Sequence, residues 1–145
     1  MENIIKDLNN FLADLNVFYR KLQNYHWNVK GKDFFQVHAK LEEYYDEINS
    51  QIDEIAEHIL ILNGQPLGTL KDYLQITKIT EASNEKIEPM QIYPEVVKDL
   101  QTLLGEVKEI KKKADESSEY GTSSLMDNYI DNYSKKLWML NQTMA

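Results

Sequence analysis

The sequence contains no cysteine, only three prolines and five glycines, and no long apolar run. The absence of cysteine excludes disulfides, thiolate-bound zinc and thiol nucleophiles, and it fits a reducing compartment. The longest apolar run, at residues 58–62, is far shorter than the roughly 20 residues that a membrane-spanning helix needs. The first residues also lack the basic and apolar segments of a signal peptide. We therefore expect a cytoplasmic protein that does not associate with membranes.

Basic residues are also few, since 16 lysines and arginines stand against 24 aspartates and glutamates and the net charge is -8. Affinity for nucleic acid depends on neutralising phosphates with basic side chains, so this balance argues against DNA binding. The first fifteen residues hold one lysine and three acids, so no basic arm is visible. The three lysines at 111–113 are typical of a solvated helix end. An acidic protein of this kind is better suited to binding cations.

Two long amphipathic helices are predicted in the first half of the chain. Apolar residues recur in steps of three and four over residues 4–29, which indicates a helix that packs along its whole length. A second helix is expected to begin at Asp33, which with Gln36 forms a capping-box-like start, and to be stopped by the residues at 63–66. A helix over 33–63 would be roughly 45 Å long, which favours a helical bundle.

The second half of the chain predicts two more long helices after a long connection. The pattern is weak over residues 64–94, where we expect a short helix at 69–76 capped by the threonine at its start. The third long helix is predicted over about 93–114, and the fourth follows a predicted loop at 117–124. A long connection suits a crossover along a bundle. We therefore predict one all-α domain over residues 1–145, a ferritin-like four-helix bundle whose crossover between helices 2 and 3 contains a short helix.

Five side chains that can bind a transition metal occur within 32 residues: His26, His38, Glu42, Asp53 and Glu57. Residues four apart share one face of a helix, so His38 pairs with Glu42 and Asp53 pairs with Glu57. Glu42 and Asp53 are eleven apart, which returns to within about 20° of the same face but separates them by about 16 Å. One chain therefore cannot close both pairs around one metal ion.

A twofold axis would solve this problem. If the second helix packs antiparallel against its own copy, with the axis near position 47.5, the first pair of one subunit meets the second pair of the other. His26 can reach the same place because the chain turns back at Gly31. Two histidines with carboxylates suit Fe(II) better than Ca²⁺ or a structural zinc ion. An acidic pair alone is more often part of a solvated helix face than a metal site. His58 points about 100° away from Glu57, toward the surface or an interface.

Several motifs are shared with one known family. They are the run Asn24-Tyr25-His26-Trp27-Asn28-Val29-Lys30-Gly31, the pair Phe34-Phe35, the five ligand-type residues with their spacing, and Gly64-Gln65-Pro66. With these motifs the sequence resembles the Dps family, the ferritin-like DNA-binding proteins from starved cells and their mini-ferritin relatives. The resemblance is most specific over 24–74 and is collinear to the end of the chain.

The resemblance implies a ferroxidase in a hollow homododecamer built from twofold dimers. His26, His38 and Glu42 would come from one subunit, and Asp53 and Glu57 from its twofold mate. Such proteins oxidise Fe(II), typically with hydrogen peroxide and otherwise with oxygen, and store ferric iron inside the shell, which protects against oxidative damage.

The resemblance also implies roles for residues around this site. Trp27 would take up oxidising equivalents, although a large apolar residue at a helix interface is more often simply core. His58 stands where the family often has arginine. Candidate acids for the pores are Asp115, Glu119 and Asp127, with Ser124 where an acid is often found, and candidate acids for mineral nucleation are Glu43, Glu47 and Glu54.

Two other functions fit the sequence less well. One is a nucleoid-compacting DNA-binding protein with secondary iron chemistry, which requires DNA affinity that falls steeply with salt. The other is a structural helical assembly with vestigial ligands, which would take up no Fe(II) beyond surface adsorption.

Overall fold

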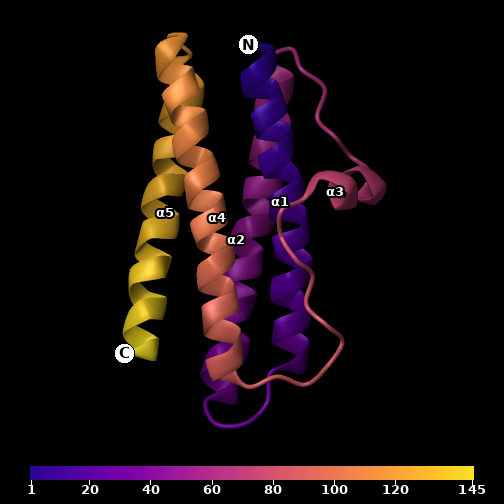
Figure 1. Ribbon diagram of the computed structural model, residues 1–145, viewed down its shortest axis with the longest axis vertical. Coiled ribbons are helices and arrows are strands. Elements are labelled where there is room, and N and C mark those ends of the chain that lie inside the picture. Colours follow the sequence, from indigo (N-terminus) through magenta and orange to yellow (C-terminus); the bar gives the residue numbers. More distant parts are fainter.

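The computed structural model describes all 145 residues and consists of five α-helices with their connections (Figure 1). The short helix α3 (Leu70–Ile76) lies on the crossover, outside the bundle. The four long helices form the bundle: α1 (Glu2–Asn28), α2 (Phe34–Ile61), α4 (Pro89–Glu116) and α5 (Tyr120–Met144). This arrangement confirms the predicted all-α fold with its long crossover. None of these helices combines the length and the apolar character that crossing a membrane requires.

The bundle consists of two helical hairpins, α1 with α2 and α4 with α5, which pack together through α1 and α4. The inner face of α1 is the apolar stripe that the sequence predicts, and Leu8, Phe11, Leu15, Phe18 and Leu22 are each at most 1% exposed. Burying each such side chain stabilises the fold by about 1.5–3 kcal/mol relative to leaving it in water. This packing holds α1 and α2 parallel to the bundle axis, and therefore fixes the place where one turns into the other.

The crossover runs the length of the bundle and is tied to α1 by polar side chains (Figure 1). Asn9 binds it near its start, donating to the carbonyl of Gln65 (3.1 Å) and accepting from the backbone N–H of Leu67 (2.9 Å). Thr69 caps α3 as predicted, since its hydroxyl accepts from the N–H of Asp72 (3.1 Å). At the far end the N–H of Lys30 donates to the carbonyl of Ile87 (2.9 Å), next to the α1–α2 turn.

The predicted capping box at the start of α2 is wrong. Asp33 does precede the helix, but its backbone is left-handed (φ 68°) and its carboxylate makes no bond to the helix N-terminus. A capping carboxylate needs an extended backbone at the cap residue. Here Gly31 (φ 94°) and Asp33 together use left-handed conformations to turn the chain within a few residues.

Two other predicted boundaries are also wrong. Helix α4 begins at Pro89, four residues before the prediction, and contains Pro94 in its interior. The start is fixed by Gln91, whose side chain accepts from the N–H of Glu88 (3.1 Å). The predicted loop at 117–124 is also too long, since α5 begins at Tyr120 and includes Gly121 in its first turn. Glycine destabilises a helix mainly in the helix interior, so its place in the first turn costs little.

Candidate metal centre

The turn between α1 and α2 brings two of the predicted ligands into direct contact. His26 lies in the last turn of α1 and His38 in the second turn of α2. Their imidazole rings stack with centroids 3.7 Å apart and planes within 11°. His26 is 6% exposed, so this part of the site is held inside the junction of the two helices.

Each of these histidines is oriented by the backbone of the other. His26 Nδ1 lies 2.6 Å from the carbonyl oxygen of His38, and His38 Nδ1 lies 2.8 Å from the carbonyl oxygen of His26. A carbonyl oxygen only accepts hydrogen bonds, so both Nδ1 atoms must carry a proton. When the rings are neutral, both Nε2 atoms are therefore unprotonated and free to bind a metal ion. Fixing the tautomer in this way is what partner groups do at established metal-bound histidines.

Glu42 completes the first half of the candidate site. Its Oε1 atom lies 3.5 Å from Nε2 of His26, and more than half of its side chain is exposed. A neutral imidazole nitrogen and a carboxylate oxygen both present lone pairs, so their approach is favourable only with a proton or another cation between or beside them. The structure therefore places His26 next to His38 and next to Glu42, with Glu42 on the open side.

Aromatic rings enclose the two histidines on their other sides. Phe34 stacks on His38 (centroids 4.9 Å apart), and the ring of Tyr45 meets His26 edge-on (5.3 Å). Burial, followed by the carboxylates of Glu42 and Asp46, raises the pKa of Tyr45, so its hydroxyl keeps its proton at neutral pH. The sequence did not indicate a role in the site for Tyr45 or Phe34. For Phe34, the sequence did contain a signal of this contact, because Phe34 is four residues before His38 and therefore on the same helix face.

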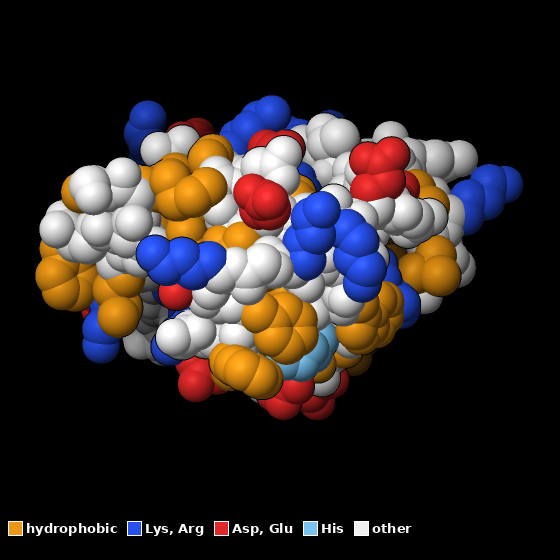
Figure 2. Space-filling model, turned by 90° about the horizontal axis from the view of Figure 1, so that it is seen from below, with side chains coloured by type: hydrophobic (Ala, Val, Ile, Leu, Met, Phe, Trp, Pro, Cys, Tyr) orange, Lys and Arg blue, Asp and Glu red, His pale blue; other side chains and the backbone are white.

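The second half of the candidate site lies elsewhere on the same helix. Asp53 and Glu57 are exposed, and α2 is an unbroken helix between them and Glu42. The helical rise therefore keeps the two halves about 16 Å apart. Within the single chain, no group of three or more histidine, aspartate and glutamate side chains is arranged to hold a metal ion. Seen from the end of the bundle near the α1–α2 turn, histidine surface lies between hydrophobic and acidic side chains (Figure 2).

Trp27 and His58 have surroundings that the sequence did not indicate. Trp27 is not a core residue in this chain, since it is 54% exposed, and the Arg20 guanidinium lies 5.8 Å from the centre of its ring. His58 is half-buried, with Nε2 only 2.8 Å from the hydroxyl of Thr122 on α5. Burial lowers the pKa of His58, although the carboxylates of Glu119 and Glu54 partly oppose this effect.

The candidate nucleation acids are all engaged in contacts within the chain. Glu43 pairs with Lys40 (2.7 Å), Glu47 pairs with Lys136, and Glu54 accepts a hydrogen bond of 2.5 Å from the Tyr129 hydroxyl. The pairs of Glu47 and Glu54 join α2 to α5.

The candidate pore acids are also partly neutralised. Lys111 lies 2.9 Å from Asp127 and 3.8 Å from Asp115. Lys113 is paired with Asp7 (2.6 Å). Two of the three consecutive lysines therefore pair with acids of the same chain, which agrees with their interpretation as a helix end.

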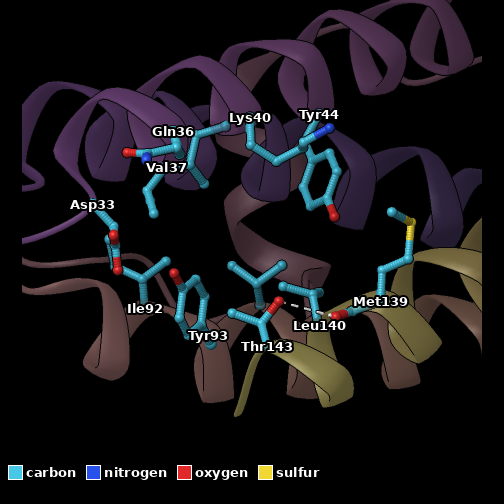
Figure 3. A pocket seen from close by; sticks show the side chains of 12 residues that line it. Asp33, Gln36, Val37, Lys40, Tyr44, Ile92, Tyr93, Met139, Leu140 and Thr143 are labelled. Carbon is cyan, nitrogen blue, oxygen red and sulfur yellow. Dashed lines mark hydrogen bonds between the residues drawn. The ribbon is translucent and has the colours of Figure 1, made fainter. Parts of the chain in front are cut away.

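An apolar pocket of about 310 Å³ lies near the same end of the bundle but contains none of the five candidate ligands (Figure 3). It opens between α2, α4 and α5, and Val37, Tyr44, Ile92 and Leu140 form part of its wall. The five candidate ligands therefore lie outside this pocket, with His26 inside the junction of α1 and α2 and the three carboxylates exposed.

Comparisons with known proteins place this arrangement in a class. The model of the ferritin-like domain matches residues 5–145. The chain is 41% identical over 140 residues to DNA protection during starvation protein 2 of Bacillus anthracis, covering 96% of this chain and 94% of that protein. It is 40% identical to general stress protein 20U of Bacillus subtilis over 140 residues, with 96% and 95% covered.

Solved structures show the same fold. The Dps protein of Vibrio cholerae O1, described as a member of a broad superfamily of ferritin-like diiron-carboxylate proteins, superposes with a TM-score of 0.96 at 38% identity. The match covers 99% of this chain and 90% of that one. The fold and the matched domain define a ferritin-like protein. Within that class, the chain belongs to the Dps family.

Proposed function

We propose that this protein is a mini-ferritin whose twofold dimers complete two Fe(II)-oxidising sites. Each site would take His26, His38 and Glu42 from one subunit and Asp53 and Glu57 from the other. The observation that carries this proposal is the pair of imidazoles whose Nδ1 atoms both lie against backbone carbonyls, with Glu42 the one carboxylate near His26 in their own chain. This arrangement leaves both Nε2 atoms available as metal ligands. A second acidic pair about 16 Å along the same helix face supplies the missing ligands only through a twofold axis.

The donor set fits iron as the substrate. Two imidazole nitrogens and three carboxylates form a mixed set of intermediate hardness, which accepts Fe(II). The carboxylates stabilise Fe(III) more than Fe(II), because their negative charge interacts more strongly with the higher positive charge. Binding at this site therefore favours loss of an electron from the substrate. The similarity to a Dps protein that is described as a diiron-carboxylate superfamily member supports this assignment.

We further propose hydrogen peroxide as the preferred oxidant, with oxygen as the slower one. Two Fe(II) ions and one peroxide, with two protons, yield two Fe(III) ions and two water molecules, so no hydroxyl radical is released. The ferric product would be stored inside a hollow dodecamer. Removing Fe(II) and peroxide together would protect DNA without contact, in keeping with the names of similar proteins. Trp27, exposed beside His26, would reduce stray oxidising equivalents, and Trp27→Phe should then increase oxidative damage elsewhere in the chain.

The test removes the second half-site. The double variant Asp53→Ala/Glu57→Ala should lose rapid Fe(II) oxidation by peroxide in stopped-flow absorbance measurements, while its size-exclusion mass stays unchanged. A control, Glu116→Ala/Asp131→Ala, removes two exposed carboxylates from α4 and α5 and should oxidise Fe(II) at the wild-type rate. Wild-type kinetics in the Asp53/Glu57 variant would refute the site assignment.

A further inference from the structure

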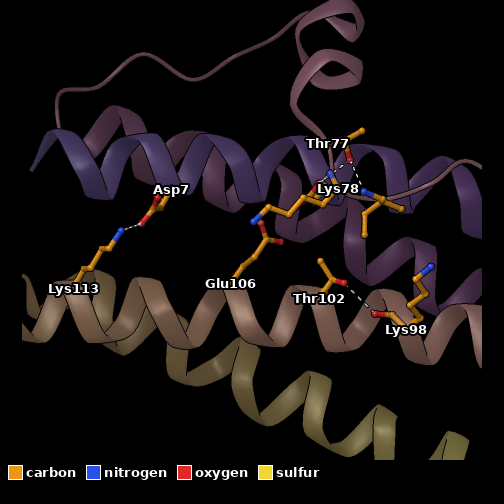
Figure 4. A network of polar contacts seen from close by, with 9 residues as sticks. Asp7, Thr77, Lys78, Lys98, Thr102, Glu106 and Lys113 are labelled. Carbon is orange, nitrogen blue, oxygen red and sulfur yellow. Dashed lines mark hydrogen bonds and ion pairs between the residues drawn. The ribbon is translucent and has the colours of Figure 1, made fainter.

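Helices α1 and α4 are joined by three polar pairs at heptad spacing. Asp7, Asp14 and Lys21 follow one another at seven-residue steps along α1, and their partners Lys113, Glu106 and Asp99 follow at the same steps down the antiparallel α4. The two outer pairs are ion pairs, with Lys113–Asp7 at 2.6 Å and Lys21–Asp99 at 2.8 Å (Figure 4 shows the first). The middle pair differs from both, because it consists of two acids.

The middle pair is buried, and its carboxylates have little to compensate their charge. Asp14 is 1% exposed, and the side chain of Glu106 is 11% exposed. One oxygen of Asp14 accepts from the Thr77 hydroxyl and from the Lys78 backbone N–H, both at 2.7 Å. The other oxygen of Asp14 and Oε1 of Glu106 have no donor among the surrounding groups. Two neighbouring buried carboxylates, each with one oxygen that lacks a donor, cannot both stay ionised.

The nearby charges do not compensate the negative charge that Asp14 and Glu106 would carry if both were ionised. The closest cation is Lys78 on the crossover, whose Nζ lies 3.7 Å from Glu106, but its side chain is 63% exposed and its charge is screened by water (Figure 4). Lys113 on α4 is already paired with Asp7 on α1. Glu109 on the next turn of α4 adds a further negative charge at the mouth of the same cleft, and Tyr133 faces Glu106 from α5 as a neutral hydroxyl.

We propose that Asp14 and Glu106 share one proton, and that this acid pair is a latch that holds the crossover on the bundle. Glu106 donates the proton to Asp14, and Asp14 uses its other oxygen to hold Thr77 and Lys78. The same contacts keep the next residue, Ile79, in the core at 4% exposure. Loss of the proton leaves two charges in contact, and they separate most readily if the crossover lifts and admits water. The latch does not depend on iron chemistry.

The direction of the pH effect follows from Glu106. Burial, and then the hydrogen bond and charge of Asp14, raise the pKa of Glu106 to about 9 in the folded chain, against 4.5 for a solvated glutamate. A carboxyl whose pKa is raised by the closed state stabilises that state at low pH. The stabilisation is lost as pH rises between these two values. Each pH unit in this window should therefore increase the population of the open crossover by about tenfold.

Hydrogen exchange of the assembled protein tests the latch. The protection factor of the Lys78 amide, corrected for the intrinsic rate at each pH, should fall about tenfold per pH unit between pH 6 and 8.5. Glu106→Gln keeps a donor to Asp14 but does not titrate, so its protection factor should be constant over this range. The control Glu109→Gln changes an exposed acid on the next turn and should keep the wild-type slope. A constant protection factor in the wild type, or the wild-type slope in Glu106→Gln, would overturn the proposal.

Infrared spectroscopy tests the shared proton in the wild type itself, so the result does not depend on whether a variant folds. Unexchanged protein at pH 7 should show the C=O stretch of a protonated carboxyl group, and the band should disappear as pH is raised above about 9. In Asp14→Asn the new amide can donate to Glu106, so Glu106 should ionise and the band should be absent at pH 7. If the wild type shows no protonated carboxyl at pH 7, Glu106 is ionised and the latch does not exist.

Discussion

Lys21→Met tests the buried ion pair between Lys21 and Asp99, which lies seven residues along the α1–α4 interface from the acid pair. Lys21 and Asp99 are 2.8 Å apart, and their side chains are only 2% and 4% exposed. Methionine keeps most of the volume and apolar length of lysine but removes the charge. The substitution therefore leaves Asp99 buried without a cation, while the packing between α1 and α4 is largely preserved.

The expected loss of stability can be worked out in two ways. At 2.8 Å and an effective dielectric constant of 20, the attraction lost is about 6 kcal/mol, but part of it only offsets the desolvation of both groups. Alternatively, Asp99 can take up a proton, which from an ordinary value of 3.8 costs about 4.4 kcal/mol at pH 7. We therefore expect the free energy of unfolding to fall by about 3–5 kcal/mol at pH 7.

The pH dependence provides the sharper assay. Burial already raises the pKa of Asp99 in the wild type against the opposing effect of Lys21, and removing Lys21 raises it further. The deficit of the variant should therefore shrink by up to about 1.4 kcal/mol per pH unit as pH is lowered from 7, until Asp99 of the wild type also takes up a proton. Urea unfolding at fixed protein concentration measures it, and Lys21→Met/Asp99→Leu should regain or exceed wild-type stability. A deficit under about 1 kcal/mol at pH 7, or one independent of pH, would refute this reasoning.

Two further substitutions test polar contacts of α2. Tyr133→Phe should lower the free energy of unfolding by about 1–3 kcal/mol, because the hydroxyl of Tyr133 donates a 2.6 Å hydrogen bond to the side-chain oxygen of the buried Gln51. The double variant Tyr133→Phe/Gln51→Leu should recover most of the loss in the same urea assay. Because burial lowers the pKa of His58, its contribution to stability should be present above pH 6.5 and decline as pH falls through the lowered pKa. The stability difference between wild type and His58→Ala should therefore be larger at pH 8 than at pH 5.5, and equal differences would exclude this role for the contact with Thr122.

The sequence predicted the long helices because their apolar periodicity is a local signal that tertiary packing reinforces. The predicted helix boundaries were wrong where they depended on one residue that is compatible with two local structures. Pro94 can start a helix or lie inside one, and Gly121 can mark a loop or occupy a first helical turn. Asp33 is of a residue type that often caps helices, but the turn from α1 imposes a left-handed backbone on it.

Parts of the candidate site could also be predicted from the sequence, and other parts could not. Helical spacing was sufficient to place His38 with Glu42 on one face of α2, and the turn at Gly31 brought His26 to them as expected. The exchange of hydrogen bonds between each imidazole and the backbone of the other could not be predicted, because it depends on the angle between α1 and α2. The acid pair of α1 and α4 was also missed, since its two members are far apart in the sequence and the register of the helices is set by the whole core.

Mixing two inactive variants tests the central claim, that each iron site is shared between two subunits, most directly. His38→Ala breaks only the first half-site of its subunit, and Asp53→Ala/Glu57→Ala breaks only the second. If the two are unfolded and reassembled together at equal amounts, half of the twofold dimers contain one of each, and each of these has one intact site. Rapid Fe(II) oxidation should return to about a quarter of the wild-type rate per subunit. Native mass spectrometry should verify that the mixed assemblies have formed. If these assemblies are as inactive as the separate variants, the shared site is contradicted.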